Sequence, residues 1–148
     1  MRLAVQTEID RPIDEVWRAF TNPANIPRWM PTLSSIDHVA GEPGRPGAMA
    51  RLVFFENGRS IVMDETVLAR RDPNEFVARF DSTHGANVIA NKFEPQDDGR
   101  TLWTLDSVFT FRGPLKLLMF FFKGVIHKRL RDDCNRFKEK LEAGKLET

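Results

Sequence analysis

Apolar residues recur every three or four positions between Pro114 and Ala143, which is the spacing of one face of an amphipathic helix. Pro114 suits the first turn of a helix, where its missing N–H would have no partner, and Gly144 is a natural stop. The sequence therefore predicts one long helix near the end of the chain, with an apolar stripe of Leu118, Phe122, Ile126, Leu130, Cys134, Phe137 and Leu141.

The first residues of the chain predict a strand followed by two short helices. Every second residue from Leu3 to Ile9 belongs to one face, which is the period of a strand with one buried side. Pro12 suits the first turn of a helix over residues 12–21. Asn22-Pro23 begins a second helix, which the prolines at positions 27 and 31 keep short.

Turn sequences divide the chain between these short helices and the long helix into six more strands. The turns at 41–47, 57–58, 72–74, 84–85 and 98–99 are rich in Gly, Pro, Asn and Asp, which suit tight reversals. We expect strands over residues 33–40, 48–56, 59–71, 75–83, 86–95 and 100–112. Consecutive hairpins give an antiparallel sheet. One long helix must cover this sheet, and a curved sheet closed over a helix leaves room for a pocket.

The residues expected to line this pocket lie on the inner side of each element. Asn91 and Ser107 are neutral polar groups that could hold a ligand hydroxyl or carbonyl, or could instead bond to backbone or buried water. Trp29 is placed either at the pocket rim or as a plug between the short helices and the sheet. The full set is Trp29, Phe76, Phe80, Ile89, Asn91, Trp103, Leu105, Ser107, Phe109, Leu118, Phe122 and Ile126.

Residues spread along the chain match the pattern of one superfamily. The opening stretch carries Ile9, Pro12, Val16-Trp17, Phe20, Asn22-Pro23, Ile26-Pro27, Trp29 and Pro31. The match extends over essentially the whole chain through Asp72-Pro73, Phe76, Phe93-Glu94-Pro95, Gly99-Arg100-Thr101 and the terminal helix. In these residues and in the order of its elements the chain resembles the START-like superfamily, in its SRPBCC branch of polyketide cyclase/dehydrase and lipid-transport proteins.

This resemblance implies an α+β helix-grip fold. In that fold a seven-stranded curved antiparallel sheet wraps around a long C-terminal helix and encloses an apolar cavity, with two short helices between the first and second strands. The family includes carriers, hormone receptors, cyclases and hydrolases, so the resemblance specifies the fold more closely than the activity.

Length and charge narrow the class of protein further. A chain of 148 residues is long enough for one domain, so we expect residues 1–148 to form a single domain. Its 22 Lys and Arg balance 21 Asp and Glu, so no strong field favours nucleic acid. The only cysteine, Cys134, forms no internal disulfide, and the first residues lack the apolar run of a signal peptide, so we expect a cytoplasmic protein.

Residues suited to catalysis are few. No metal site or other cofactor is expected, because His38, His84 and His127 have no ligating residue at suitable spacing. Asp64 and Glu65 are the only candidate catalytic residues, because strand alternation turns one of these adjacent carboxylates toward the inside. Burial would raise the pKa of that carboxyl toward neutrality. The alternative, which we favour at this point, is a bulge or edge position that leaves both in water.

The run from Leu117 to Phe122 is apolar around the whole circumference of a helix, so something besides the core must meet it. One interpretation is a gate at the cavity mouth. The others are a contact between two copies of the chain, or a peripheral membrane anchor assisted by nearby cations, namely Lys116, Lys123, Lys128 and Arg129.

Three functions follow from these patterns. The first is a carrier or binding module for a small hydrophobic ligand such as a lipid, polyketide or aromatic metabolite. The second is a cyclase, dehydrase or hydrolase that uses the inward carboxylate in the same cavity. The third is a membrane-surface or protein-interaction module that acts through the basic, Phe-rich helix.

Overall fold

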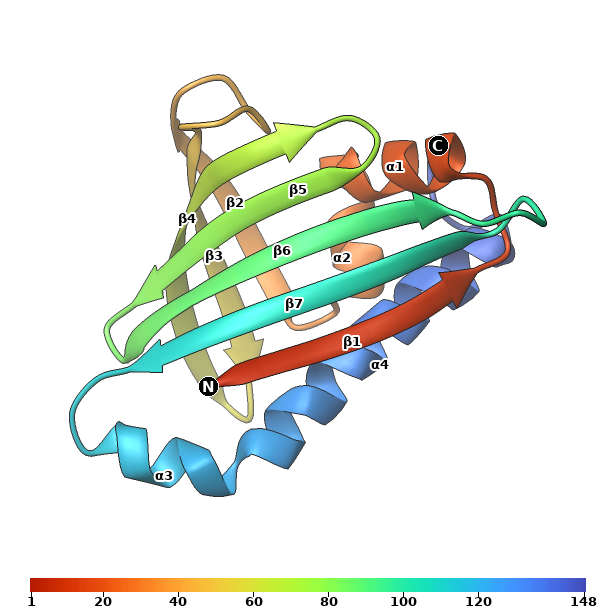
Figure 1. The fold of residues 1–148 in the computed structure, drawn as a ribbon. Coiled ribbons are helices and arrows are strands. Elements are labelled where there is room, and N and C mark those ends of the chain that lie inside the picture. The colour runs from red at the N-terminus through yellow and green to blue at the C-terminus, as the bar shows by residue number, and fades with distance from the viewer.

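Seven strands form one antiparallel sheet in the computed structural model, which describes residues 1–148. The order across the sheet is β1-β7-β6-β5-β4-β3-β2, so β2 to β7 form a meander and β1 pairs with β7 (Figure 1). The strand bounds are β1 (Arg2–Ile9), β2 (Leu33–Ala40), β3 (Met49–Glu56), β4 (Arg59–Arg71), β5 (Glu75–Ser82), β6 (Gly85–Pro95) and β7 (Thr101–Phe111).

Helices stand at both ends of this sheet and along its β1 edge. Between β1 and β2 lie α1 (Ile13–Thr21), a short 3₁₀ turn η1 (Pro23–Asn25) and α2 (Ile26–Trp29). After β7 come α3 (Leu115–Phe121) and α4 (Lys123–Glu142). Figure 1 shows α1 and α2 at one end of the sheet, α3 at the other, and α4 running between them along β1. The seven-stranded helix-grip fold is confirmed, and each predicted strand end lies within one residue of the observed one.

The prediction of one continuous C-terminal helix is wrong. Phe122, with φ −96° and ψ 5°, ends α3 and precedes α4, and its N–H bonds to Met119 O in a tightened last turn. The interruption lets α3 rest against β7 while α4 packs along β1 and α2. A straight helix would keep Leu118 and Phe122 on the same stripe as the buried Cys134 and Phe137, but both are exposed.

We call the sheet together with the helices that it wraps the grip. The main core lies at the end of the grip that α1 and α2 cover. Six aromatic side chains from α1, α2, β6, β7 and α4 pack with ring centroids between 5.1 and 6.5 Å apart. We call them the aromatic plug: Trp17, Phe20, Trp29, Phe93, Trp103 and Phe137. These rings fill the space between the sheet and α4 beneath α1 and α2.

Gly124, in the first turn of α4, tests whether the break before it needs a glycine. A Cβ added there meets nothing within 4 Å, and the residue is exposed. We therefore expect Gly124→Ala to raise the free energy of unfolding by about 0.5–1 kcal/mol, because alanine loses less backbone entropy in a helix.

Chemical denaturation of the purified variant measures this difference. Gly99→Ala is the matched control, since its added Cβ also meets open space but its φ is +81°. That conformation should cost about 1–2 kcal/mol for alanine. A destabilised Gly124→Ala would show that the start of α4 needs the freedom of glycine.

Candidate functional site

We call the end of the sheet opposite α1 and α2 the open end of the grip. There a row of inward-facing side chains crosses five strands. Register places Phe109 of β7, Asn87 of β6, Phe80 of β5, Glu65 of β4 and Ala50 of β3 side by side on the inner face. All five are half-buried. Two residues closer to the aromatic plug along β7, β5 and β4, the inward residues Ser107, Ala78 and Val67 are buried. The row therefore marks where the filled part of the grip ends, and we call it the open row.

Glu65 is the only charged side chain in the open row. Burial raises the pKa of its carboxyl, and no hydrogen bond or ion pair within the protein opposes that shift. Its neighbour Asp64 lies on the outer face, where Arg51 Nε donates to it at 2.9 Å. The interpretation that both carboxylates stay in water is therefore wrong, because β3, β4 and β5 pair regularly on both sides of Glu65 and alternation turns it inward.

Two hydrogen-bonded pairs line the inner face beside the row. Trp103 Nε1 donates to Asn91 Oδ1 at 3.0 Å, and Asn91 Nδ2 donates weakly to Phe76 O at 3.5 Å. Ser107 Oγ donates to Asn87 Oδ1 at 2.6 Å. Asn91 is thus occupied by the core, whereas the amide nitrogen of Asn87 has no partner in the protein. Asn87 is the polar neutral group best placed to meet a ligand.

The structure divides the residues that were expected to line a pocket into three groups. Trp29, Trp103 and Leu105 lie in the core around the aromatic plug, with Phe76 and Ile89 packed against it. Phe80 packs against a smaller cluster of Leu33, Leu52 and Phe54, and Phe109 and Ile126 are half-buried. Leu118 and Phe122 are exposed, since the helix that carried them is divided.

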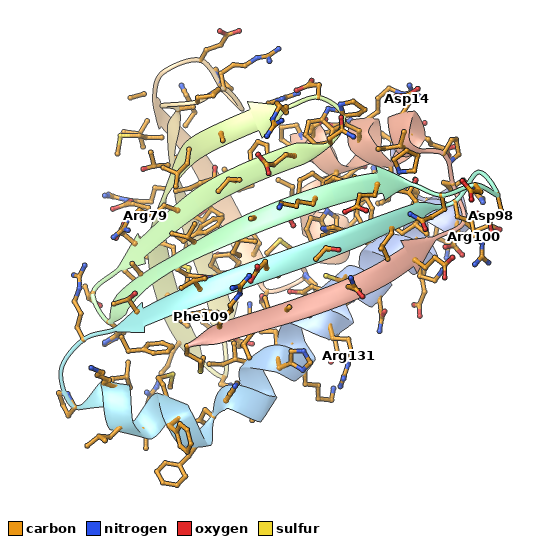
Figure 2. The ribbon with its side chains drawn as sticks, in the orientation of Figure 1. Asp14, Arg79, Asp98, Arg100, Phe109 and Arg131 are labelled. Carbon is orange, nitrogen blue, oxygen red and sulfur yellow. The ribbon has the colours of Figure 1, made fainter.

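A pocket of about 520 Å³ lies between the end of β7 and α3. Phe109 and Phe111 form its sheet side, and their rings are stacked 5.7 Å apart. Figure 2 labels Phe109 at this end of β7. The other lining residues are Met1, Thr110, Lys116, Met119, Phe120 and Lys123. The pocket is therefore mostly apolar with two ammonium groups at its edge, and Phe109 joins it to the open row.

A polar contact ties α4 to the far flank of the sheet. Arg129 of α4 contacts the carboxylate of Glu56 at the end of β3 and donates to Thr32 Oγ1 at 2.7 Å. Its guanidinium also lies 5.8 Å from the ring centroid of Phe54. This contact holds the β2–β3 flank and α4 together, so the grip is closed on that side.

The remaining reactive groups stand apart from the open row. Cys134 is buried in the core, and burial together with the Asp133 carboxylate raises the pKa of its thiol to about 12. No three His, Cys, Asp or Glu side chains come together as a metal ion would require. None of the helices combines the length and apolar character needed to cross a membrane.

Comparison with protein families identifies the family of this chain. Residues 1–142 match the family described as polyketide cyclase/dehydrase and lipid transport. The chain belongs to this family. A search of curated proteins found no match.

Solved structures with the polyketide cyclase/dehydrase and lipid-transport fold superpose over nearly the whole chain. The protein TTHA0849 from Thermus thermophilus is 16% identical with a TM-score of 0.80, covering 97% of this chain and 99% of its own. The Zhui aromatase/cyclase from Streptomyces sp. R1128 is 14% identical with a TM-score of 0.81, covering 96% and 93%. Ara h 8.0201 is 14% identical with a TM-score of 0.73, covering 97% and 98%. At these identities the likeness shows the fold alone.

Sequence reasoning missed two parts of this family member's site. Asn87 alternates in phase with Ile89 and Asn91 on β6 and was considered as an inward-facing residue, but it was not included among the expected lining residues. Lys116 and Lys123 were considered only as membrane-facing cations, because a continuous helix offers no pocket between α3 and β7. The pocket lies where α3, before the division at Phe122, approaches β7, and Gly124 was the one sequence feature that could allow a kink there.

Proposed function

We propose that the protein binds a small, mostly apolar molecule at the open end of the grip, between β7 and α3. The observation that carries this proposal is the pocket of about 520 Å³ lined by Phe109, Phe111, Met119 and Phe120. Its volume falls in the range of about 300–1,000 Å³ that is typical of small-molecule sites. Membership in a family described by polyketide and lipid chemistry also supports such a ligand.

The polar groups around the pocket suggest the character of the ligand. Lys116 and Lys123 line the pocket edge and make no ion pair within the protein, so either could meet a carboxylate, sulfate or phosphate. Asn87 in the adjoining row could hold a carbonyl or hydroxyl. A fatty acid, a polyketide acid or an acidic aromatic metabolite combines these features, and the protein would act as its carrier or binding module.

Binding of an apolar anionic fluorophore tests this proposal. We expect 1-anilinonaphthalene-8-sulfonate to bind with enhanced fluorescence, and Phe109→Ala to weaken its affinity about tenfold, because half of a phenylalanine surface is lost from the pocket wall. Val108→Ala is the matched control, since Val108 is exposed on the outer face of the same strand. Equal affinities for the two variants would contradict the proposed place of the pocket.

The natural ligand can be sought with the same protein. Native mass spectrometry of the purified chain, followed by extraction, should reveal a retained small molecule that competes with the fluorophore. A retained compound that leaves fluorophore binding unchanged would point to a different site.

A second candidate function is catalysis by Glu65. The specific observation is a lone inward carboxyl whose pKa is raised by burial, because such a group holds its proton more tightly than a solvated carboxyl and could serve as a general acid or base. Asn87, two strands away in the open row, could orient a substrate carbonyl. A similar fold occurs in a protein named an aromatase/cyclase, which is compatible with this role.

A further inference from the structure

The most exposed apolar side chains of the molecule gather around the division between α3 and α4. Leu117, Phe120, Phe121 and Val125 are 79%, 75%, 81% and 65% exposed, more than any other large apolar residue. Phe120 and Phe121 follow Leu117 by three and four residues and lie with it on one side of α3, and Val125 belongs to the first turn of α4. Figure 2 shows ring side chains that project from α3 away from the sheet. We call these four residues the apolar tip.

The apolar tip is not the packed side of α3. Leu115 and Met119, on the other side of this helix, are half-buried, and Met119 lines the pocket against β7. No residue of α3 is fully buried. The helix thus has one apolar side against the sheet and a second in water, and the second needs a partner outside the chain.

Positive charge predominates in the part of the chain that carries the apolar tip. Between Asp106 and Asp132 the chain has six Lys and Arg and no Asp or Glu. Two of the six are neutralised, since Arg129 contacts Glu56 and Lys128 Nζ lies 2.6 Å from Asp132. The other four make no ion pair within the protein, and all are exposed: Arg112, Lys116, Lys123 and Arg131.

We propose that the apolar tip docks onto a lipid bilayer that contains anionic lipids. Phenylalanine and leucine side chains would enter the boundary between headgroups and acyl chains, and the surrounding cations would meet lipid phosphates. Each unpaired Lys or Arg adds attraction to such a surface, and the apolar residues supply the contact that salt does not screen.

A second copy of the chain is a poorer occupant of this surface. A twofold contact brings a patch against itself, so the apolar tips of two copies would also bring their unpaired cations together. Like charges opposed at a contact reduce its stability. A membrane with anionic headgroups offers the complementary charge instead.

Docking would also bring the pocket to the bilayer. Lys116, Phe120 and Lys123 line the pocket and lie within or beside the tip, so its α3 wall would face the lipid headgroups. An amphipathic ligand could then pass between bilayer and pocket without crossing open water.

Co-sedimentation with lipid vesicles tests the docking. We expect vesicles of phosphatidylcholine with about 30% phosphatidylglycerol to bind the protein about a hundredfold more tightly than pure phosphatidylcholine at about 50 mM salt. The binding should weaken about tenfold or more at about 500 mM salt. Leu117→Ser combined with Phe121→Ser should weaken it by a further factor of about ten.

The double variant leaves the pocket intact, because neither Leu117 nor Phe121 lines it. Val39→Ser combined with Leu68→Ser is the matched control, since both residues are exposed and belong to β2 and β4, away from α3 (Figure 1). It should bind vesicles like the unchanged protein. Thermal unfolding establishes that both double variants fold.

Three outcomes would overturn the docking proposal. One is an absence of binding to anionic vesicles at low salt, and another is binding that the Leu117→Ser and Phe121→Ser changes leave unaltered. The third is a dimer, measured by sedimentation equilibrium, that these two changes convert to monomer, because the tip would then be a contact between copies. Fluorophore binding to the pocket is independent of all three.

Discussion

Replacing Trp103 with alanine is expected to lower the free energy of unfolding by about 3–5 kcal/mol. Trp103 is fully buried on β7 and packs against Phe20, Trp29, Phe93 and Phe137 at centroid distances of 5.3–6.0 Å. Truncation would leave a cavity at the centre of the aromatic plug, which neighbours fixed on four other elements can fill only in part. The tryptophan also donates to Asn91, whose oxygen would lose its partner.

Urea unfolding followed by circular dichroism measures this loss. Trp103→Phe separates the two causes, because it keeps a ring in the plug but removes the donor to Asn91. We expect it to cost about 1–3 kcal/mol. Phe109→Ala on the same strand and the same face should cost less than Trp103→Ala, since Phe109 is only half-buried. Equal losses at the two positions would mean that the two ends of the grip are packed alike.

This contrast between Trp103 and Phe109 shows which structural features the sequence can predict. Alternation along residues 100–112 places both residues on the inner face, and the register with β6 confirms it. Turn chemistry at Asn57-Gly58 and Asp98-Gly99 fixes the strand ends, because few residues tolerate the positive φ that these turns adopt. The elements and their order were therefore predictable from local patterns, whereas the helix-grip arrangement was what the family resemblance implied.

Local patterns do not reveal which part of an inner face is filled. Trp103 is surrounded because α1, α2 and α4 all converge at one end of the sheet, and that convergence is a property of the assembled fold. Phe109 lies near the start of α4, where α3 and only the first residue of α4, Lys123, line the pocket. The sequence thus identified the inward residues but could not divide them between core and site.

The break at Phe122 has the same origin. Leu117, Leu118 and Met119 are good helix formers and the three phenylalanines that follow are weaker ones, so propensity alone does not place a break at Phe122. The helix is divided because α4 packs along β1, whereas β7 is the only strand against which α3 packs. The excess of apolar residues, which no single buried face could absorb, was the signal that some of them serve another surface.

Glu65→Gln should change both stability and chemistry at the open row. Because burial raises the pKa of this carboxyl above its ordinary value of 4.5, the folded chain holds the proton more tightly than the unfolded chain does. Protonation therefore favours folding, and this contribution is full below pH 4.5 and is lost as pH rises through the higher folded value. At neutral pH the buried charge is unfavourable, so the glutamine variant should be more stable there. Its advantage should shrink on acidification.

Unfolding free energies of the two forms measure this effect when they are determined from about pH 4, below the ordinary pKa of 4.5, to about pH 8. Asp64→Asn is the matched control on the next residue. Asp64 pairs with Arg51 on the outer face, so its loss should change stability by about 0–1 kcal/mol. A pH profile that Glu65→Gln leaves unaltered would mean that Glu65 titrates as it does in water.

The same pair of variants separates a carrier from an enzyme. A binding module needs no proton exchange at the open row, so Glu65→Gln would still take up 1-anilinonaphthalene-8-sulfonate in the Phe109 pocket. If the protein transforms its ligand with Glu65 as acid or base, the variant should lose about 10²- to 10⁴-fold in turnover, while Asp64→Asn stays active. The retained compound identified by mass spectrometry is the substrate to use. Full turnover by Glu65→Gln would show that Glu65, the only carboxyl on the open row, takes no part in the chemistry.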